Sequence, residues 1–248
     1  MKLLTIYNVF DAEEFLACSV AHTRPVSDSI LCMTQTVSNH GNAYQGGLNE
    51  ARRLLEAKQI DFIIEYSPSC FNNPMKCETE KRNTGLQFAK AHGFDHVLMM
   101  DCDEFFVTDE LRGAKAYVEA HPKIDWWVCN IKVYFKRVDL TVGMDKTRMA
   151  FISKAGIACG NTHGRHIIDW TRRYNSPNYE TIDITMHHYS WVRKDIARKV
   201  ENSTARRHIE KSNLMENYNG ACEGSRVAHY GAHLEKCEVP FGCLDNIF

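Results

Sequence analysis

Apolar, strand-forming segments alternate with amphipathic, helix-forming segments through the first 100 residues, and this alternation most constrains the fold. The pattern predicts strands at 3–9, 29–34, 61–66 and 96–100, and helices at about 11–22, 48–58 and 78–92. The acids after Asp11 suit the positive end of a helix dipole, and Gly93 suits a helix end. This order predicts an open, mostly parallel sheet with helices on both faces.

The second half of the chain has a less regular pattern. It predicts a helix at 111–121, strands at 126–135 and 181–189, a loop at 155–166, a long charged helix at 192–217 and an irregular tail at 218–248. We therefore expect a catalytic domain over 1–191, with halves 1–110 and 111–191, followed by a helical or irregular extension over 192–248.

Composition excludes several classes of protein. The 248 residues suffice for one large α/β domain and are too few for two catalytic domains. A formal net charge of −1 gives no global field that would recruit nucleic acid or anionic membrane. The N-terminal apolar run turns acidic, unlike a signal peptide, and no run reaches the length of a membrane span. The 10 cysteines contain no Cys-x-x-Cys pair, so we expect reduced thiols and a cytoplasmic protein.

Three acids, Asp101, Asp103 and Glu104, follow the apolar strand at 96–100. Ligands bind beyond the carboxyl ends of strands in an open α/β sheet. Carboxylates one residue apart can reach the same hard cation, and burying three acids is costly unless a cation or hydrogen bonds compensate. The sequence thus predicts that Asp101 and Asp103 bind Mn²⁺ or Mg²⁺. The alternative is that Asp101 caps a turn and Asp103 begins a helix.

Four stretches carry a resemblance to a known family. They are Thr5-Ile-Tyr7-Asn8, Thr34-Gln35-Thr36-Val-Ser38-Asn39, Glu80-Lys81-Arg82-Asn83-Thr84-Gly85 and Leu98-Met-Met-Asp101-Cys-Asp103-Glu104. In order and spacing they resemble the nucleotide-diphospho-sugar transferases with the GT-A fold, in particular the family-2-like group. The resemblance covers roughly residues 1–110.

The resemblance implies a fold, an activity and a set of ligand contacts. The implied fold is GT-A, a Rossmann-like open mixed, mostly parallel sheet flanked by helices, here with a helical C-terminal extension. The implied activity is a metal-dependent hexosyl- or pentosyltransferase that uses a nucleotide-sugar, with UDP the first candidate nucleotide. The implied nucleotide-sugar contacts are Thr5, Tyr7, Asn8, Gln35, Lys81, Arg82, Asn83 and Asp101.

Three of these positions carry a reservation. The family usually has an acid where this chain has Gln35, so the base remains open. Tyr7 could instead be a core aromatic residue, and Arg82 could lie on a solvated helix face.

Late residues supply candidates for the rest of the site. Alternation along a strand lets only one of His187 and His188 face a metal, and we favour His188. Imidazole suits manganese as carboxylate does. An inverting reaction needs a carboxylate base, for which Asp169 and Glu180 are the candidates, whereas a retaining reaction needs none.

Other polar segments leave the acceptor open. The loop Gly160-Asn161-Thr-His163-Gly164-Arg165-His166 could bind a sugar or be only a turn. The basic residues of 192–217 form either a solvated helix face or a surface for a polyanion such as hydroxymethylated phage-type DNA; a glycan or its precursor is the other acceptor class. They are Arg193, Lys194, Arg198, Lys199, Arg206, Arg207 and Lys211.

Two other functions and a second metal site are weaker hypotheses. A haloacid-dehalogenase-like phosphatase or phosphotransferase needs a small residue soon after Asp-x-Asp, where this chain has Phe105 and Phe106. A non-enzymatic nucleic-acid-binding module would use the basic C-terminal helix. His229, His233 and Cys237, spaced four apart with Cys222 and Cys243 nearby, could bind zinc. The oligomeric state is not predicted.

Overall fold

The computed structural model of the protein describes residues 1–247 except 70, 72, 161–167, 204–213 and 228. Its elements through the first half are β1 (Leu3–Val9), α1 (Glu13–Thr23), β2 (Ser29–Thr34), α2 (Gly46–Glu56), β3 (Phe62–Glu65), α3 (Pro74–Ala91), β4 (His96–Asp101), β5 (Glu104–Phe105) and α4 (Thr108–Ala120). The second half contains β6 (Trp126–Phe135), β7 (Leu140–Met144), β8 (Met149–Lys154), η1 (Trp170–Arg172), β9 (Tyr179–Trp191), α5 (Ile196–Asn202), α7 (Leu214–Gly220), β10 (Arg226–Val227), β11 (Ala232–His233), β12 (Glu235–Lys236) and η2 (Gly242–Asn246).

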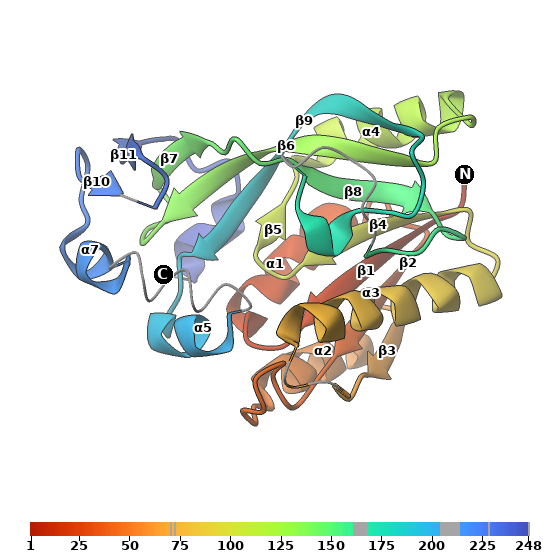
Figure 1. Ribbon diagram of the computed structural model, residues 1–248, viewed down its shortest axis with the longest axis horizontal. Helices are drawn as coiled ribbons and strands as arrows, with labels where there is room; N and C mark the ends of the chain where they lie inside the picture. Colours follow the sequence, from red (N-terminus) through yellow and green to blue (C-terminus); the bar gives the residue numbers. More distant parts are fainter. Residues whose placement is uncertain (70, 72, 161–167, 204–213, 228, 248) are drawn as a thin grey trace.

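A ten-stranded mixed sheet runs through the molecule (Figure 1). Strands β3, β2, β1 and β4 are parallel neighbours in that order. β8 then joins β4 and β6 in antiparallel pairing, and β6 pairs with β7 antiparallel and with β9 parallel. The prediction of an open mixed sheet flanked by helices is confirmed, and its parallel pairing is concentrated in the first half of the chain.

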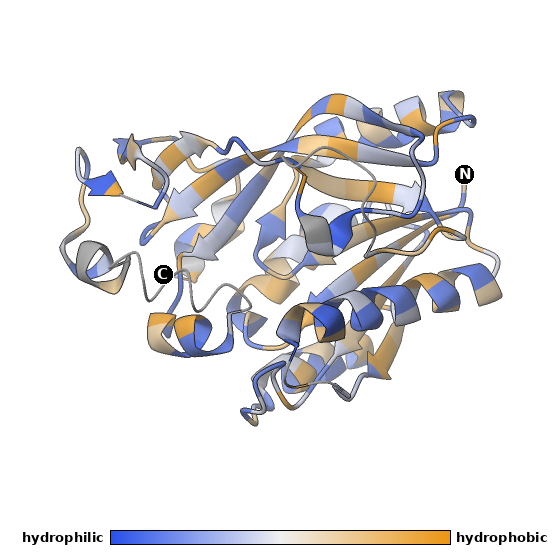
Figure 2. Cartoon of the chain, in the orientation of Figure 1, coloured by the Kyte–Doolittle hydropathy of each residue, from blue (hydrophilic) through white to orange (hydrophobic). Residues whose placement is uncertain are grey.

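Side-chain alternation along β1 gives the sheet two packed faces. Tyr7 and Val9 share one apolar cluster with residues of α1, α2 and α4, whereas Leu4 and Ile6 share another with α3. α3 lies close to the strand, because a Cβ at Gly85 would come within 3.1 Å of Ile6. The α3 face turned to the viewer in Figure 2 is mostly hydrophilic, as expected for a helix that covers a sheet.

The predicted elements of the first half are all present, and most of their boundaries lie within two residues of the prediction. α3 begins at Pro74, four residues before the predicted start, because Asn73 caps it by accepting a hydrogen bond from the Lys76 amide. In the second half the sequence pattern missed β7 and β8, which lie on either side of a turn and complete the sheet beside β6.

The predicted single helix over 192–217 is wrong. α5 ends at Asn202, and Ser203 is extended, with φ −68° and ψ 134°. Two contacts from the segment after β2 hold this end: Asn42 donates to the Asn202 side chain, and the His40 ring lies 3.0 Å from the Ser203 carbonyl. Tertiary hydrogen bonds thus override a helix-forming sequence. Residues 204–213 lie outside the described part of the chain.

The C-terminal tail is more ordered than predicted. β10 pairs with β11, and β12 adds to the main sheet beside β7. Phe241 and Leu244 are fully buried beside η2 and within it. Burying a side chain of this size contributes about 1.5–3 kcal/mol, so the tail is anchored to the core.

The prediction that all the cysteines are reduced is also wrong. The structure joins Cys18 of α1 and Cys243 of η2 in a disulfide. The two residues are 225 positions apart in sequence, so no local spacing revealed the pair. Among the described residues, no helix is both long and apolar enough to cross a membrane.

Candidate functional site

A cavity of about 310 Å³ lies beyond the carboxyl ends of β1, β2 and β4. Residues of α3 line it on one side, and residues of η1, β9 and α5 line it on others. Its position is the one where open α/β sheets bind ligands, and its volume lies at the lower end of the range for small-molecule sites.

Asp101 ends β4 and is held between two arginines. Arg82 of α3 lies 3.3 Å from one carboxylate oxygen, and Arg172 of η1 lies 2.7 Å from the other. Burial raises the pKa of Asp101, but the neighbouring cations Arg172, Arg82 and Lys81 lower it by more than burial raises it. The net pKa is therefore well below its usual range. The carboxylate is therefore ionised, and its position is fixed by the protein itself.

Glu104 supports this arrangement from inside the core. Its Oε1 accepts from Arg172 at 2.6 Å, and its Oε2 accepts from the Asp101 backbone amide at 2.7 Å. The side chain is fully buried, which raises the pKa of Glu104, while Arg172 opposes that rise. Hydrogen bonds and an ion pair thus compensate the third acid of the cluster.

Asp103 has a different set of neighbours. It is 3% exposed and forms an ion pair with Arg193, while Lys199 of α5 lies 3.7 Å away. Burial raises the pKa of Asp103, but Arg193 and Lys199 lower it below its usual value overall. Nε2 of His188 lies 3.8 Å from Asp103 Oδ1.

The two neighbouring histidines point to opposite sides of β9. His188 lines the cavity, whereas His187 Nδ1 lies 2.7 Å from the Tyr134 hydroxyl in the core. Pairing of Glu104 with His188 in the β5–β9 ladder sets this alternation. His188 is therefore the histidine of the pair that can reach a ligand in the cavity.

The donor chemistry fits a manganese ion at Asp103 and His188. An oxygen and an imidazole nitrogen face each other across 3.8 Å, and both suit this metal. Asp103 is itself engaged by Arg193 and Lys199, as Asp101 is by Arg82 and Arg172, and among the described residues Asp101, Asp103 and His188 do not form a close group of three metal-ligand atoms. The participation of Asp101 in metal binding stays a prediction.

Two amide side chains also line the cavity, and one of them, Asn8, pairs with Asp101 in the β1–β4 ladder. Asn8 at the end of β1 and Gln35 after β2 are 8% and 2% exposed. Asn8 Oδ1 and Gln35 Oε1 are buried and have no hydrogen-bond partner among the described residues. Gln35 is held in place by donating to the Val37 carbonyl at 2.9 Å. An unsatisfied buried acceptor is costly, so these oxygens are suited to a donor on a ligand.

Thr5 and Tyr7, two of the implied nucleotide contacts, lie outside the cavity. The Tyr7 hydroxyl is 2.8 Å from both Ser19 and Thr23 of α1, and Thr5 contacts Ser27. Both are fully buried, and burial raises the pKa of Tyr7. These side chains point to the α1 face of the sheet, so the interpretation of Tyr7 as a core aromatic residue agrees with the structure.

The three implied contacts from α3 divide into two groups. Lys81 and Arg82 line the cavity and are almost fully buried. Burial lowers the pKa of Lys81, while Asp101 and Glu78 oppose that shift. Asn83 instead exchanges hydrogen bonds with the backbone of Cys159, at 2.7 and 3.2 Å, and so positions the following loop.

The structure separates the two candidate bases. Asp169 lines the cavity, and its Oδ1 accepts from the amide and hydroxyl of Thr171 at 2.9 and 2.7 Å. Glu180 lies near the start of β9, far along the strand from His188, and accepts from the Tyr117 hydroxyl. Only Asp169 of the pair is brought to the cavity.

Arg172 and the cations near Asp103 were not assigned to the site by the sequence. Arg172 lies 71 positions after Asp101, and no local motif marks it. Arg193 and Lys199 stood out only as part of a basic stretch, which the structure partly turns inward. Arg198 lies over the Tyr44 ring at 4.0 Å.

Several other predictions fall outside the described residues or are not brought together. Residues 161–166 of the Gly-rich loop and the cations Arg206, Arg207 and Lys211 lie outside that part of the chain. His233 contacts the Gly224 carbonyl, and His229 packs against Tyr230. Neither joins Cys237 in a group of metal-ligand atoms among the described residues.

Comparisons with known proteins find only distant similarity in structure. No family model and no curated protein matches the chain. A crystal structure of S. aureus TarS 1-349 is 12% identical over 84% of this chain and 66% of its own, with a TM-score of 0.46. A longer TarS structure is 12% identical, covers 89% of this chain and 44% of its own, and has a TM-score of 0.47.

The chain thus spans less than two thirds of these proteins' length. A mannose-1-phosphate geranyltransferase structure from Thermus thermophilus is 14% identical over 56% of this chain and 43% of its own, with a TM-score of 0.36. Similarity at this level carries no functional conclusion, which has to come from the cavity itself.

Proposed function

We propose that the protein is a metal-dependent glycosyltransferase that moves a sugar from a nucleotide diphosphate, in the first instance a UDP-sugar, to an acceptor hydroxyl. One observation carries the proposal. A single cavity is lined both by unpaired amide acceptors and by buried cations with paired carboxylates. A nucleotide diphosphate requires both kinds of group, because its base offers N–H donors and its phosphates require positive charge.

The amide side chains of Asn8 and Gln35 would hold the base. Uracil has an N–H flanked by two carbonyl groups, and Gln35 Oε1 or Asn8 Oδ1 can accept from it. The Gln35 amide replaces the acid that the GT-A resemblance led us to expect. An uncharged acceptor costs less to bury than a carboxylate, which suits the buried position of Gln35.

The charged side chains of the cavity would hold the diphosphate. Lys81, Arg82 and Arg172 line the cavity around Asp101, and an anion there would stabilise their charges. Asp103 and His188 would hold Mn²⁺ or Mg²⁺. When bound, the metal supplies Lewis-acid stabilisation of the leaving diphosphate.

Asp169 is the carboxylate placed to act on the acceptor. If the reaction inverts the anomeric centre, Asp169 would take the proton of the acceptor hydroxyl as the sugar is transferred. Its hydrogen bonds with Thr171 fix the direction of the carboxylate. The acceptor would be a glycan or a hydroxymethylated DNA base, and the protein would be a hexosyl- or pentosyltransferase.

The alternative functions make different demands on the chain. A phosphatase of the haloacid-dehalogenase type would need a small residue soon after the acids, whereas Phe105 and Phe106 stand there and are fully buried. A nucleic-acid-binding module would need outward cations, whereas Arg193 and Lys199 approach Asp103. These observations favour the transferase.

Calorimetric titration of UDP with and without Mn²⁺ tests the proposal. We expect Mn²⁺-dependent binding to the wild type that is lost in Asp103→Asn and kept in the matched carboxylate control Glu180→Gln. Asparagine is preferable to alanine because it preserves packing around buried Arg193. Thermal unfolding should verify that both variants are folded.

Three outcomes would count against the proposal. UDP binding that ignores Mn²⁺ would refute the metal requirement. If UDP, GDP, CMP and TDP all fail to bind, the cavity is not a nucleotide-sugar site. Release of phosphate from simple phosphomonoesters, lost in Asp103→Asn, would favour the phosphatase.

A further inference from the structure

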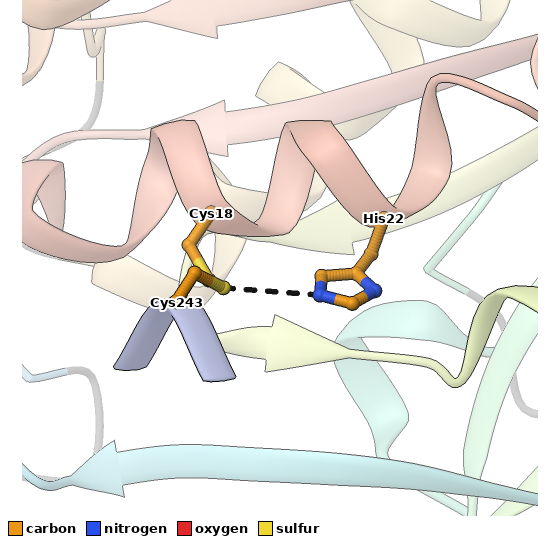
Figure 3. A group of neighbouring side chains, drawn as sticks. All are labelled: Cys18, His22 and Cys243. Carbon is orange, nitrogen blue, oxygen red and sulfur yellow. Dashed lines mark hydrogen bonds between the residues drawn. A yellow bond between two sulfur atoms is a disulfide. The ribbon is translucent and has the colours of Figure 1, made fainter. Parts of the chain in front are cut away.

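A second group of metal-ligand side chains lies away from the cavity, between α1 and the C-terminal η2 (Figure 3). Cys18 and His22 are one helical turn apart on α1, and Cys243 approaches them from η2. The ligand atoms of the three residues all lie within 4.8 Å of one another. They are the one such group of His, Cys, Asp and Glu found among the described residues.

Packing fixes the segment that carries Cys243. Phe241 is fully buried, with its ring centroid 4.8 Å from that of His22 and 5.1 Å from that of Phe105. Leu244, on the other side of the cysteine, is fully buried as well. The backbone therefore presents Cys243 to α1 independently of the sulfur–sulfur bond, and the Cα atoms of Cys18 and Cys243 are 5.9 Å apart.

The ring of His22 is oriented as a metal ligand requires. The Thr108 hydroxyl donates its hydrogen to the His22 carbonyl at 3.0 Å. Its oxygen, 3.3 Å from Nδ1, can then only accept, so the ring proton resides on Nδ1. Nε2 is left with a free lone pair and points to Cys243, with its nitrogen 3.8 Å from Sγ (Figure 3). Ligand histidines commonly have such a partner on the other ring nitrogen.

We propose that the reduced protein binds a zinc ion through Cys18, His22 and Cys243. A dithiol reductant passes two electrons to the disulfide, is oxidised to its own disulfide, and leaves two protein thiols. Zinc then displaces the two thiol protons and is held by two sulfurs and one imidazole nitrogen. Water fills the fourth position, which His22 and Cys243 leave reachable because both are partly exposed. The same three residues thus offer a disulfide when oxidised and a zinc site when reduced.

Cobalt and zinc titrations of the full chain test the proposal. The protein is reduced without air by a water-soluble phosphine, which is oxidised to its oxide and does not compete as a thiol. We expect one equivalent of Co²⁺ to produce thiolate charge-transfer bands and tetrahedral d–d bands, and one equivalent of Zn²⁺ to bleach them. The charge-transfer bands require sulfur, so they distinguish this site from Asp103 and His188.

Variants separate the zinc site from the disulfide. His22→Gln keeps both cysteines and should still form the disulfide, yet it should lose the cobalt bands at stoichiometric metal. Thr108→Val removes the partner of the ring and should weaken zinc binding by roughly 10- to 100-fold. Cys222→Ser, at an exposed free cysteine, is the matched control and should bind as the wild type does.

Two results would overturn the zinc site. Reduced wild-type protein without stoichiometric sulfur-ligated cobalt would refute it outright. Equal zinc affinity in His22→Gln and the wild type would exclude the three-residue site, whatever the state of the cysteines. Neither result bears on nucleotide binding, because Cys18, His22 and Cys243 are not among the described residues that line the cavity.

Discussion

The charged and the amide side chains of the cavity meet the cost of burying polar atoms in opposite ways. Asp101 and Asp103 are paired with arginines that the chain itself supplies. The oxygens of Asn8 and Gln35 have no partner among the described residues. The charged group is therefore organised before any ligand arrives, whereas a ligand would complete the amide group. Changes in the charged group should affect folding as well as binding, and changes in the amide group mainly binding.

The largest effect is expected for Arg172→Met. This arginine is 1% exposed and pairs with both Asp101 and Glu104, so its loss leaves buried Glu104 without its ion-pair partner and leaves Asp101 with Arg82 as the remaining one of its two arginines. Breaking a buried pair in this way costs about 3–5 kcal/mol of unfolding free energy. Urea denaturation would measure it, with the exposed Arg112→Met as a control that should change little.

A double variant tests the cause. Adding Glu104→Gln to Arg172→Met removes the buried acid that has lost its partner and should recover part of the lost stability. If the double variant is less stable than the wild type by the sum of the two single-variant costs, Arg172 and Glu104 are not coupled, and the charged side chains do not form a self-contained unit.

The next effect is a pH dependence carried by Asp101. Its folded pKa lies below the unfolded value of 3.8, so its ionisation stabilises the fold above that value, and the contribution is lost as pH falls through the folded pKa. At pH 6, Asp101→Asn should be less stable than the wild type by roughly 1.5–3 kcal/mol. The difference should shrink below pH 3.8. A difference that stays constant from pH 6 to pH 3 would show that Asp101 does not act through its charge.

Changes to the amide side chains should weaken ligand binding and hardly change the free energy of unfolding. Gln35→Met has a similar volume and removes an unpaired buried acceptor together with the hydrogen bonds donated to the Val37 carbonyl and the Asn39 side chain. We expect a small change in unfolding free energy and about tenfold weaker UDP binding, the equivalent of one hydrogen bond of about 1.4 kcal/mol. Calorimetry and urea denaturation on the same sample would show both. A large stability loss with unchanged UDP affinity would show that Gln35 serves folding and not binding.

The sequence predicted the acids of the cavity better than the arginines that pair with them. Local pattern placed Asp101 and Asp103 at the end of β4, because an apolar strand and the acids after it are contiguous. Arg172 and Arg193 come from distant segments, and only tertiary folding brings them to the acids. Long-range pairing of this kind leaves no periodic signal in a single sequence.

The same limit explains the other differences between sequence and structure. Tyr7 lies on the correct strand, but which face it occupies depends on whether α1 offers Ser19 and Thr23 as partners. The disulfide of Cys18 and Cys243 joins the two ends of the chain. β7 and β8 were missed because the polar residues around them obscure the alternation, although both pair with β6 in the sheet.

The smallest effect is expected for Glu180, the carboxylate that the sequence placed beside Asp169 as a candidate base. In the structure its partner is the Tyr117 hydroxyl on α4, at 2.9 Å, and it does not line the cavity. Glu180→Gln keeps the side-chain shape and an acceptor for that hydroxyl, so sugar transfer and UDP affinity should both stay within about twofold of the wild type. Asp169→Asn, by contrast, should lower the transfer rate by roughly 10²–10⁴-fold if an inverting reaction uses it as the base. Rates measured with the same donor would compare the two variants directly. Equal and unchanged rates would remove both carboxylates from the chemistry and favour a retaining reaction, whereas a large loss in Glu180→Gln alone would mean that the reacting groups meet outside this cavity.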